Sequence, residues 1–181
     1  STHQIEKDTA NRRKAVLLTA KAIEVLEADP AGAKTAALEA TRLAPDLVPA
    51  AATAARAALR LGDVRKAAKI LETSWKHEPH PEVADVYIHA RPGDSTHDRL
   101  ERAKKLQALR TNNAESSLAV ARAALDAGEF PLARREVEAA IRLEPREGAY
   151  LLLADIEEAE TGDQGKVRQW LGKAVRAPRD P

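Results

Sequence analysis

The 181-residue sequence contains no cysteine and no methionine, and aromatic residues make up only 3% of it. The absence of cysteine excludes disulfides, zinc sites built from thiolates and cysteine nucleophiles. The shortage of aromatic side chains argues against a deep small-molecule pocket, because such pockets are usually walled by aromatic clusters. No apolar run is long enough to cross a bilayer, and no signal peptide is visible.

A surplus of charge of one sign is also missing. The 29 lysines and arginines nearly balance the 28 aspartates and glutamates, which leaves a formal net charge of +1. Such a chain has no strong general attraction to nucleic acid or to an acidic membrane surface. Its short basic runs are not interleaved with aromatic residues that could stack on bases, so we expect no nucleic-acid partner.

Motifs of catalysis are absent as well. The sequence has no nucleophile elbow, no phosphate-binding loop and no metalloprotease helix motif. Acidic residues cluster at Asp155, Glu157, Glu158 and Glu160, but an acidic run on a helix is usually a solvated surface. Because no side chains stand in paired chemical roles, we predict that the chain is not an enzyme.

Prolines and glycines, by contrast, recur with a regular period. Pro45 and Pro79 are 34 residues apart, and Pro79 and Pro145 are 66 residues apart. Gly62 and Gly128 are again 66 residues apart. A period of about 34 residues is that of tetratricopeptide repeats, each made of two helices and two turns. We therefore predict an all-α fold, a right-handed superhelical solenoid of about five helix pairs.

Each period carries the same internal pattern. An acidic residue follows the glycine, as Asp63 follows Gly62, and an alanine lies five residues after the glycine, at Ala67 and Ala133. Small residues let two helices approach closely, the glycine turns the chain, and the final proline ends the second helix because it has no N–H to donate. The predicted helices cover residues 4–28, 31–43, 48–61, 64–77, 82–91, 96–110, 115–127, 131–143, 147–161 and 165–176.

We expect a single tetratricopeptide-repeat domain over residues 1–181, which begins with a partial first repeat and a long N-terminal helix at 1–45. The third unit is irregular because residues 91–95 form a longer turn, where we expect a local distortion but no domain break. The chain starts within a helix and stops at an Asp-Pro sequence, which we interpret as a fragment of a longer protein. Repeats are predicted at 46–79, 80–113, 114–145 and 146–178.

Solenoids of this kind bind partners on an extended concave surface, lined by the first helix of each pair. Positions six and two residues before a turn glycine lie one helical turn apart on that face. Arginine forks bind carboxylates bidentately, so an acidic peptide or a C-terminal carboxylate would be a suitable partner; the alternative is that these arginines are ordinary solvated ones. The predicted groove residues are Arg56, Arg60, Tyr87, Arg91 and Arg122, with Asp126 one turn after Arg122 and Ile156 and Glu160 at the same positions of the last repeat.

Histidine supports a second interpretation. His77 and His80 flank Pro79 at a junction between repeats. An axial heme ligand needs an imidazole in a snug apolar pocket, whereas polar residues are expected at a turn for other reasons. These two residues are therefore weak heme-ligand candidates, and no metal site is predicted. A heme or porphyrin carrier that uses them is the alternative to a protein-binding scaffold.

Several stretches resemble the HemY-type proteins of proteobacteria, the tetratricopeptide family described as heme-biosynthesis-associated. The more specific of them are Trp75–Pro81 (WKHEPHP) and Glu157–Trp170 (EEAETGDQGKVRQW). The resemblance extends over nearly the whole chain, with further matching stretches at Arg12–Ala20, Arg42–Ala51, Arg91–Ser95 and Ala177–Pro181.

The resemblance implies a full-length protein with two N-terminal membrane helices, neither of which is in this sequence, and with its repeats on the cytoplasmic face of the bacterial inner membrane. It implies no enzymatic activity. We therefore predict a soluble, non-enzymatic scaffold that binds a protein or peptide partner, of acidic character, in its concave groove and is associated with heme biosynthesis. A third interpretation is self-assembly, because solenoid ends without capping repeats expose apolar faces.

Overall fold

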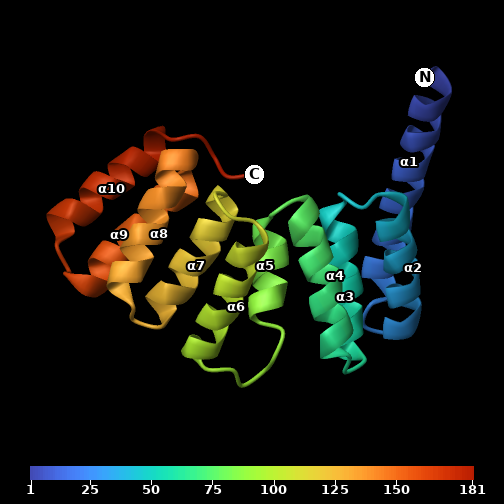
Figure 1. Cartoon of the computed structure of the whole chain (residues 1–181), viewed down its shortest axis with the longest axis horizontal. Coiled ribbons are helices and arrows are strands. Elements are labelled where there is room, and N and C mark those ends of the chain that lie inside the picture. Colours follow the sequence, from blue (N-terminus) through green and yellow to red (C-terminus); the bar gives the residue numbers. More distant parts are fainter. The chain divides into compact units, whose positions relative to one another are not determined.

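Ten α-helices and no strand make up the computed structural model, which describes all 181 residues (Figure 1). This confirms the predicted all-α fold, and all helices except α1 and α5 begin and end within one residue of the predicted positions. None of the helices combines the length and the hydropathy needed to span a bilayer. The helices are α1 (Thr2–Val25), α2 (Pro30–Leu43), α3 (Val48–Arg60), α4 (Val64–His77), α5 (Pro81–Ile88), α6 (Thr96–Leu109), α7 (Ala114–Asp126), α8 (Phe130–Leu143), α9 (Glu147–Glu160) and α10 (Gln164–Arg176).

The turn inside a helix pair depends on a glycine followed by an acidic residue. Gly62 takes a φ of +79°, and its counterpart Gly128 takes a φ of +73°. This left-handed conformation is unfavourable for residues with a Cβ. The residue after Gly62 is Asp63, whose carboxylate accepts the N–H of Lys66 at 3.0 Å and caps α4. Gly62-Asp63 is thus a helix stop joined directly to a helix start, and Asp163 after Gly162 caps α10 in the same way. Glu129 after Gly128 makes no such side-chain bond.

Prolines set the other helix boundaries. α4 ends at His77, two residues before Pro79, and α5 ends at Ile88, three residues earlier than predicted. Pro92 explains the early end, because it has no N–H to donate to the carbonyl of Ile88 and its ring would clash with that carbonyl. The predicted helix end at Arg91 was therefore wrong, and Arg91 lies in the turn that follows α5.

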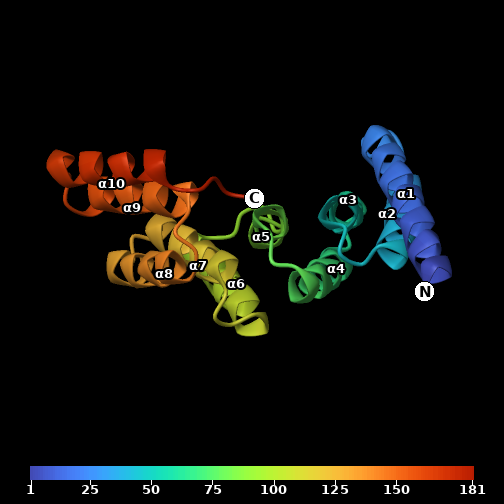
Figure 2. The same ribbon diagram turned by 90° about the horizontal axis from the view of Figure 1, so that it is seen from above.

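Contacts divide the chain into two compact units, Ser1–Gly93 and Asp94–Pro181. In the N-terminal unit, α1 packs on α2, α2 on α3 and α3 on α4, and α5 packs on both α3 and α4 (Figure 2). In the C-terminal unit, α6 to α10 each pack on the next helix, and α7 also contacts α9. The division falls at the predicted longer turn and inside the repeat expected at residues 80–113. The expectation of one domain over residues 1–181 remains a prediction.

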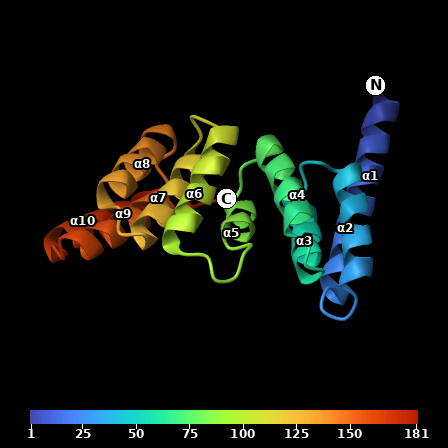
Figure 3. The ribbon, with the colours of Figure 1, turned by 60° about the horizontal axis from the view of Figure 1, so that its bottom comes forward.

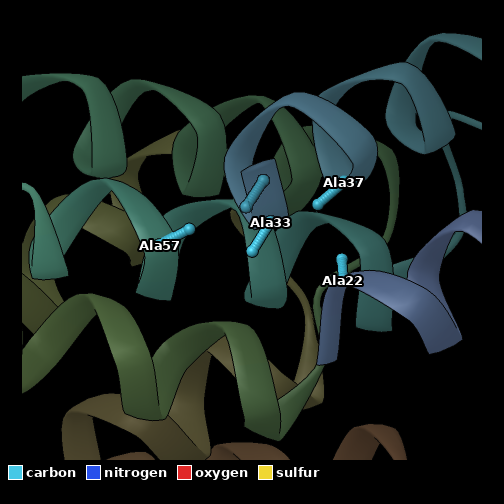
Figure 4. Close-up of a cluster of buried hydrophobic side chains, with 5 residues drawn as sticks. Ala22, Ala33, Ala37 and Ala57 are labelled. Atoms are coloured by element: carbon cyan, nitrogen blue, oxygen red, sulfur yellow. The ribbon is translucent and has the colours of Figure 1, made fainter. Parts of the chain in front are cut away.

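Alanine dominates the core of the N-terminal unit. Ala22, Ala33, Ala37, Ala54 and Ala57, from α1, α2 and α3, are completely buried against one another (Figure 4). Side chains of one carbon allow helix axes to approach closely, and their small size leaves no room for larger residues. The internal alanines of the repeat are thus the contacts at which successive helices meet.

Candidate partner-binding groove

Each unit has its own first-helix face, formed by the first helices of its pairs: α1, α3 and α5 in the N-terminal unit, and α7 and α9 in the C-terminal unit. Direct contacts of α1 with α3, of α3 with α5 and of α7 with α9 show that these helices are neighbours within their unit. The predicted groove residues other than Arg91 lie on three of them, α3, α5 and α7.

Arg56 and Arg60 lie one turn apart on α3, as predicted, and each binds a carboxylate of a neighbouring repeat. Arg56 donates through Nη1 to Glu82 Oε1 of α5 at 3.0 Å. Arg60 donates through Nη1 and Nη2 to the two oxygens of Glu27 at 2.5 Å each. Exposed ion pairs of this kind are worth about 0–1 kcal/mol. An acidic partner could displace them at small cost, but their first role is to connect successive repeats.

Tyr87 does not present its hydroxyl to an open groove. Its side chain is buried, at 5% exposure, and the phenol donates to Glu72 Oε2 of α4 at 2.6 Å. The residue therefore joins α5 to α4. Arg91, predicted one turn farther along the same helix, is exposed in the turn beyond its end.

Arg122 is the predicted groove residue that lines a cavity. It lies half-buried on α7 and borders a space of about 380 Å³ between α7 and α9. Unlike Arg56 and Arg60, it makes no ion pair within the chain. The remaining lining residues are Leu125, Asp126, Gly148, Leu151, Leu152 and Asp155.

This groove combines an apolar floor with charge of both signs. Leu125 of α7 and Leu151 of α9 supply apolar surface. Leu151 is 39% exposed, which is high for a large apolar side chain. Asp126 and Asp155 are exposed carboxylates at its edge. Such a surface can bury an apolar side chain while Arg122 binds an acidic group.

The α9 residues that face the groove are not those expected from their positions in the repeat. Ile156, at the position equivalent to Arg122, is completely buried, and Asp155 faces the groove instead. The residue of α9 that faces the groove is thus one position earlier in the repeat than the corresponding residue of α7. The signal that could have identified it is the series Gly148, Leu151 and Asp155, whose spacings of three and four place them on one side of a helix.

The C-terminal residues return to the start of α9, beside the groove residue Gly148. Gly148 donates its backbone N–H to Asp180 Oδ1 at 2.6 Å, and Glu147 donates its N–H to the carbonyl of Pro178 at 2.7 Å. A Cβ on Gly148 would lie only 2.5 Å from an Asp180 oxygen. A side chain at position 148 would therefore displace the Asp180 carboxylate.

A buried ion pair sets the distance between the two groove helices. Arg146 Nη2, at the start of α9, lies 2.5 Å from Glu115 Oε1 at the start of α7. Both residues are 6% exposed. Asp180 Oδ2 lies 3.9 Å from Arg146 Nε, so the same guanidinium also faces the returning C-terminal residues.

A second ion pair, between a buried glutamate and a half-buried arginine, holds α9 to α8. For Glu157 it corrects the expected solvated character of the acidic run. Glu157 is 2% exposed, and Arg134 Nη2 donates to its Oε2 at 2.9 Å. Thr161 Oγ1 donates to the same oxygen at 2.6 Å. The hydrogen bonds from Arg134 and then from Thr161 lower the pKa of Glu157 to about 2. Arg134 also binds Glu160 through Nε at 2.6 Å, so the network is a brace for α9.

The two candidate histidines have separate surroundings. His80 caps α5, since its Nδ1 accepts the N–H of Glu82 at 3.1 Å. His77 is exposed at the end of α4 and borders a different cavity, of about 250 Å³, in the N-terminal unit. No group of three or more His, Cys, Asp or Glu side chains is arranged to hold a metal ion.

Comparison with known proteins supports the repeat architecture. No protein-family profile matches the sequence. The chain is 28% identical over 173 residues to the probable magnetosome protein Mms48 of Magnetospirillum gryphiswaldense. That alignment includes 95% of this chain but spans only 38% of the length of Mms48.

Two crystal structures of MamA are similar in fold. One superposes with a TM-score of 0.52 at 17% identity over 90% of this chain and 91% of MamA. The other superposes with a TM-score of 0.53 at 18% identity over 83% of this chain and 89% of MamA. These likenesses show a tetratricopeptide-like helical solenoid, and they lend no support to the narrower HemY-type resemblance.

Proposed function

We propose that this chain is a non-enzymatic protein-interaction module, and that the groove between α7 and α9 receives a segment of its partner. The observation that carries the proposal is Arg122, which borders a cavity of about 380 Å³ without an ion-pair partner, beside Leu151, which is 39% exposed. Exposed apolar surface is favourably covered by a partner, and Arg122 has no ion pair that a partner would first have to break.

The groove defines the chemistry of the partner segment. An apolar side chain would fill the space over Leu125 and Leu151, and an adjacent carboxylate would pair with Arg122. Asp126 and Asp155 would accept backbone N–H groups or a basic side chain at the edge. The expected ligand is therefore a short amphipathic segment with an acidic residue next to its apolar anchor.

The relatives support an interaction role only in a general way. The MamA likeness supports a solenoid with an extended face suited to binding, and the magnetosome description belongs to Mms48. Association with heme biosynthesis and placement at the cytoplasmic face of the bacterial inner membrane rest on the HemY-type resemblance alone. Both remain predictions, and the groove proposal does not depend on them.

Selection of peptides by phage display against the whole chain tests the proposal. We expect the selected peptides to share an apolar residue beside an acidic one. Affinity, measured by fluorescence polarisation, should fall about tenfold or more on Arg122→Glu. Arg135→Glu is the matched control, because Arg135 is an exposed arginine on α8 without an ion pair.

The predicted apolar contact with the partner is tested by a second variant and its control. Leu151→Asp should weaken the same peptides, whereas Leu143→Asp, at a leucine that is 48% exposed on α8, should not. Peptides that bind all four variants as well as the parent chain would place the interaction site elsewhere.

The heme or porphyrin carrier remains the alternative function. His77 borders a cavity that His80 does not line, so the two candidate ligands do not converge on one cavity. Titration with hemin decides between the two functions. A saturable Soret shift at one equivalent, lost in His77→Ala or His80→Ala, would replace the scaffold proposal with the carrier.

A further inference from the structure

We propose that the N-terminal unit carries a second binding site, a small cavity between α2 and α4 that takes a phosphate monoester group. The cavity has a volume of about 250 Å³ and is bordered by the end of α2, by Ala51 of α3 and by one side of α4. Figure 3 shows the ribbon of these helices. The site is independent of the α7–α9 groove, because every residue that lines it belongs to the N-terminal unit.

The first argument is the sign of the lining charges. Arg42, Lys66, Lys69 and His77 all border the cavity, and no acidic residue does. Lys66, Lys69 and His77 follow the helical spacings of three to four residues along one side of α4, with Thr73 between Lys69 and His77. Lys66 and Lys69 are like charges three residues apart, a spacing at which their repulsion destabilises a helix. A bound anion would remove this repulsion.

The second argument is that the two lysines have no ion-pair partner within the chain. Arg42 is compensated, since it donates through Nε and Nη2 to the two oxygens of Glu39 at 2.9 and 2.6 Å. The ammonium groups of Lys66 and Lys69 are exposed and pair with no carboxylate. The cavity therefore has two uncompensated positive charges in a chain whose net charge is only +1.

The third argument distinguishes a phosphate from a carboxylate. A carboxylate is best bound by the planar edge of a guanidinium, but the Nε–Nη2 edge of Arg42 is already occupied by Glu39. Besides Arg42 Nη1, the remaining donors are point donors, namely two ammonium groups and the hydroxyls of Thr73 and Ser74, which make no side-chain hydrogen bond to the rest of the chain. A tetrahedral dianion with several acceptor oxygens matches such a set.

The test uses the whole chain and inorganic phosphate as the probe. Backbone amide resonances should be followed by two-dimensional NMR during a phosphate titration at constant ionic strength. We expect saturable shifts confined to residues of α4 and the end of α2. The double variant Lys66→Gln/Lys69→Gln should weaken binding about tenfold or more. The control Lys21→Gln/Lys105→Gln removes two exposed lysines that do not line the cavity and should bind phosphate like the parent chain.

A second arm identifies the source of the phosphate group. Co-sedimentation with phosphatidylcholine vesicles that contain phosphatidic acid, lost in the Lys66/Lys69 variant only, would identify a lipid headgroup. Phosphate binding without vesicle binding would identify a free small anion. The proposal is overturned by an absence of saturable shifts together with no vesicle binding, or by equal losses in the two double variants. Circular dichroism of each variant confirms that the helices are retained.

Discussion

Arg134 on α8 reaches Glu157 on α9 with Nη2 to Oε2 at 2.9 Å, although Glu157 is 2% exposed and carries its charge. A buried carboxylate is tolerated when its partner and additional hydrogen bonds compensate for lost hydration. Thr161 supplies one such bond at 2.6 Å. Because α9 forms one wall of the candidate groove, this interaction positions the binding surface without taking part in binding.

Removal of Arg134 should therefore destabilise the C-terminal unit strongly. Arg134→Met leaves the charge of Glu157 buried and unpaired, at an expected cost of about 3 kcal/mol in the free energy of unfolding. Urea denaturation followed by circular dichroism measures the change. Arg135→Met, at the exposed neighbour, should stay within about 0.5 kcal/mol of the parent chain. A small effect of Arg134→Met would show that Glu157 becomes protonated or rehydrated at little cost.

The same carboxylate predicts a pH dependence. The pKa of Glu157 falls from the ordinary value of 4.5 to about 2 in the folded chain. Its contribution to stability is complete above pH 4.5 and is lost as the pH falls toward 2. In Glu157→Gln the urea midpoint should be lower at pH 7 but should fall less between pH 5 and pH 3. Glu138→Gln, at an exposed glutamate of α8, should retain the parent slope. Parallel slopes for all three proteins would contradict the assignment.

The turn glycines should be intolerant of alanine. Gly62→Ala forces a side chain into a φ of +79° and should cost about 1–2 kcal/mol. Gly172 provides the opposite control, because it lies within α10 and an added Cβ would meet nothing closer than 4.0 Å. Gly172→Ala should stabilise the chain by about 0.5–1 kcal/mol through helix propensity. Thermal or urea unfolding of the two variants should therefore shift in opposite directions.

The alanine core should be intolerant of larger residues. Ala54→Leu places three additional carbons where Ala22, Ala33 and Ala37 are already completely buried, and should cost about 1–3 kcal/mol. Ala20→Leu, on the exposed side of α1, should be nearly neutral. Equal stability of the two variants would mean that the helices separate to accommodate the side chain, which a change in the NMR shifts of α1 to α3 would reveal.

Much of the architecture was predictable because local chemistry determines it. Gly62 followed by Asp63, and Pro79 after α4, mark helix ends through backbone angles and capping groups that depend on adjacent residues only. The end of α5 was predicted three residues too late, although Pro92 indicates it, because a proline removes the hydrogen bond to the carbonyl four residues earlier, here that of Ile88. The placement of Arg56 and Arg60 one turn apart on the same side of α3 was likewise predictable from helical periodicity.

Pairing between repeats was not predictable from local signals. The partners of Arg56 and Arg60 are 26 and 33 residues away in sequence, and those of Arg134 are 23 and 26 residues away. Nothing near Glu157 in the sequence distinguishes it from the exposed Glu158, since which of the two faces α8 depends on the rotation of α9. The same rotation turned Asp155 rather than Ile156 toward the groove.

The sequence by itself determined the period, the helices, their caps and the alanine contacts, because each depends on steric and hydrogen-bonding preferences within a few residues. The tertiary structure alone decided which charged side chains form ion pairs within the chain and which do not. It compensated Arg56 and Arg60 with carboxylates of other repeats and left Arg122, Lys66 and Lys69 without an ion-pair partner. Ion pairing depends on distances of a few ångströms between side chains of different helices, and those distances are set only when the helices pack.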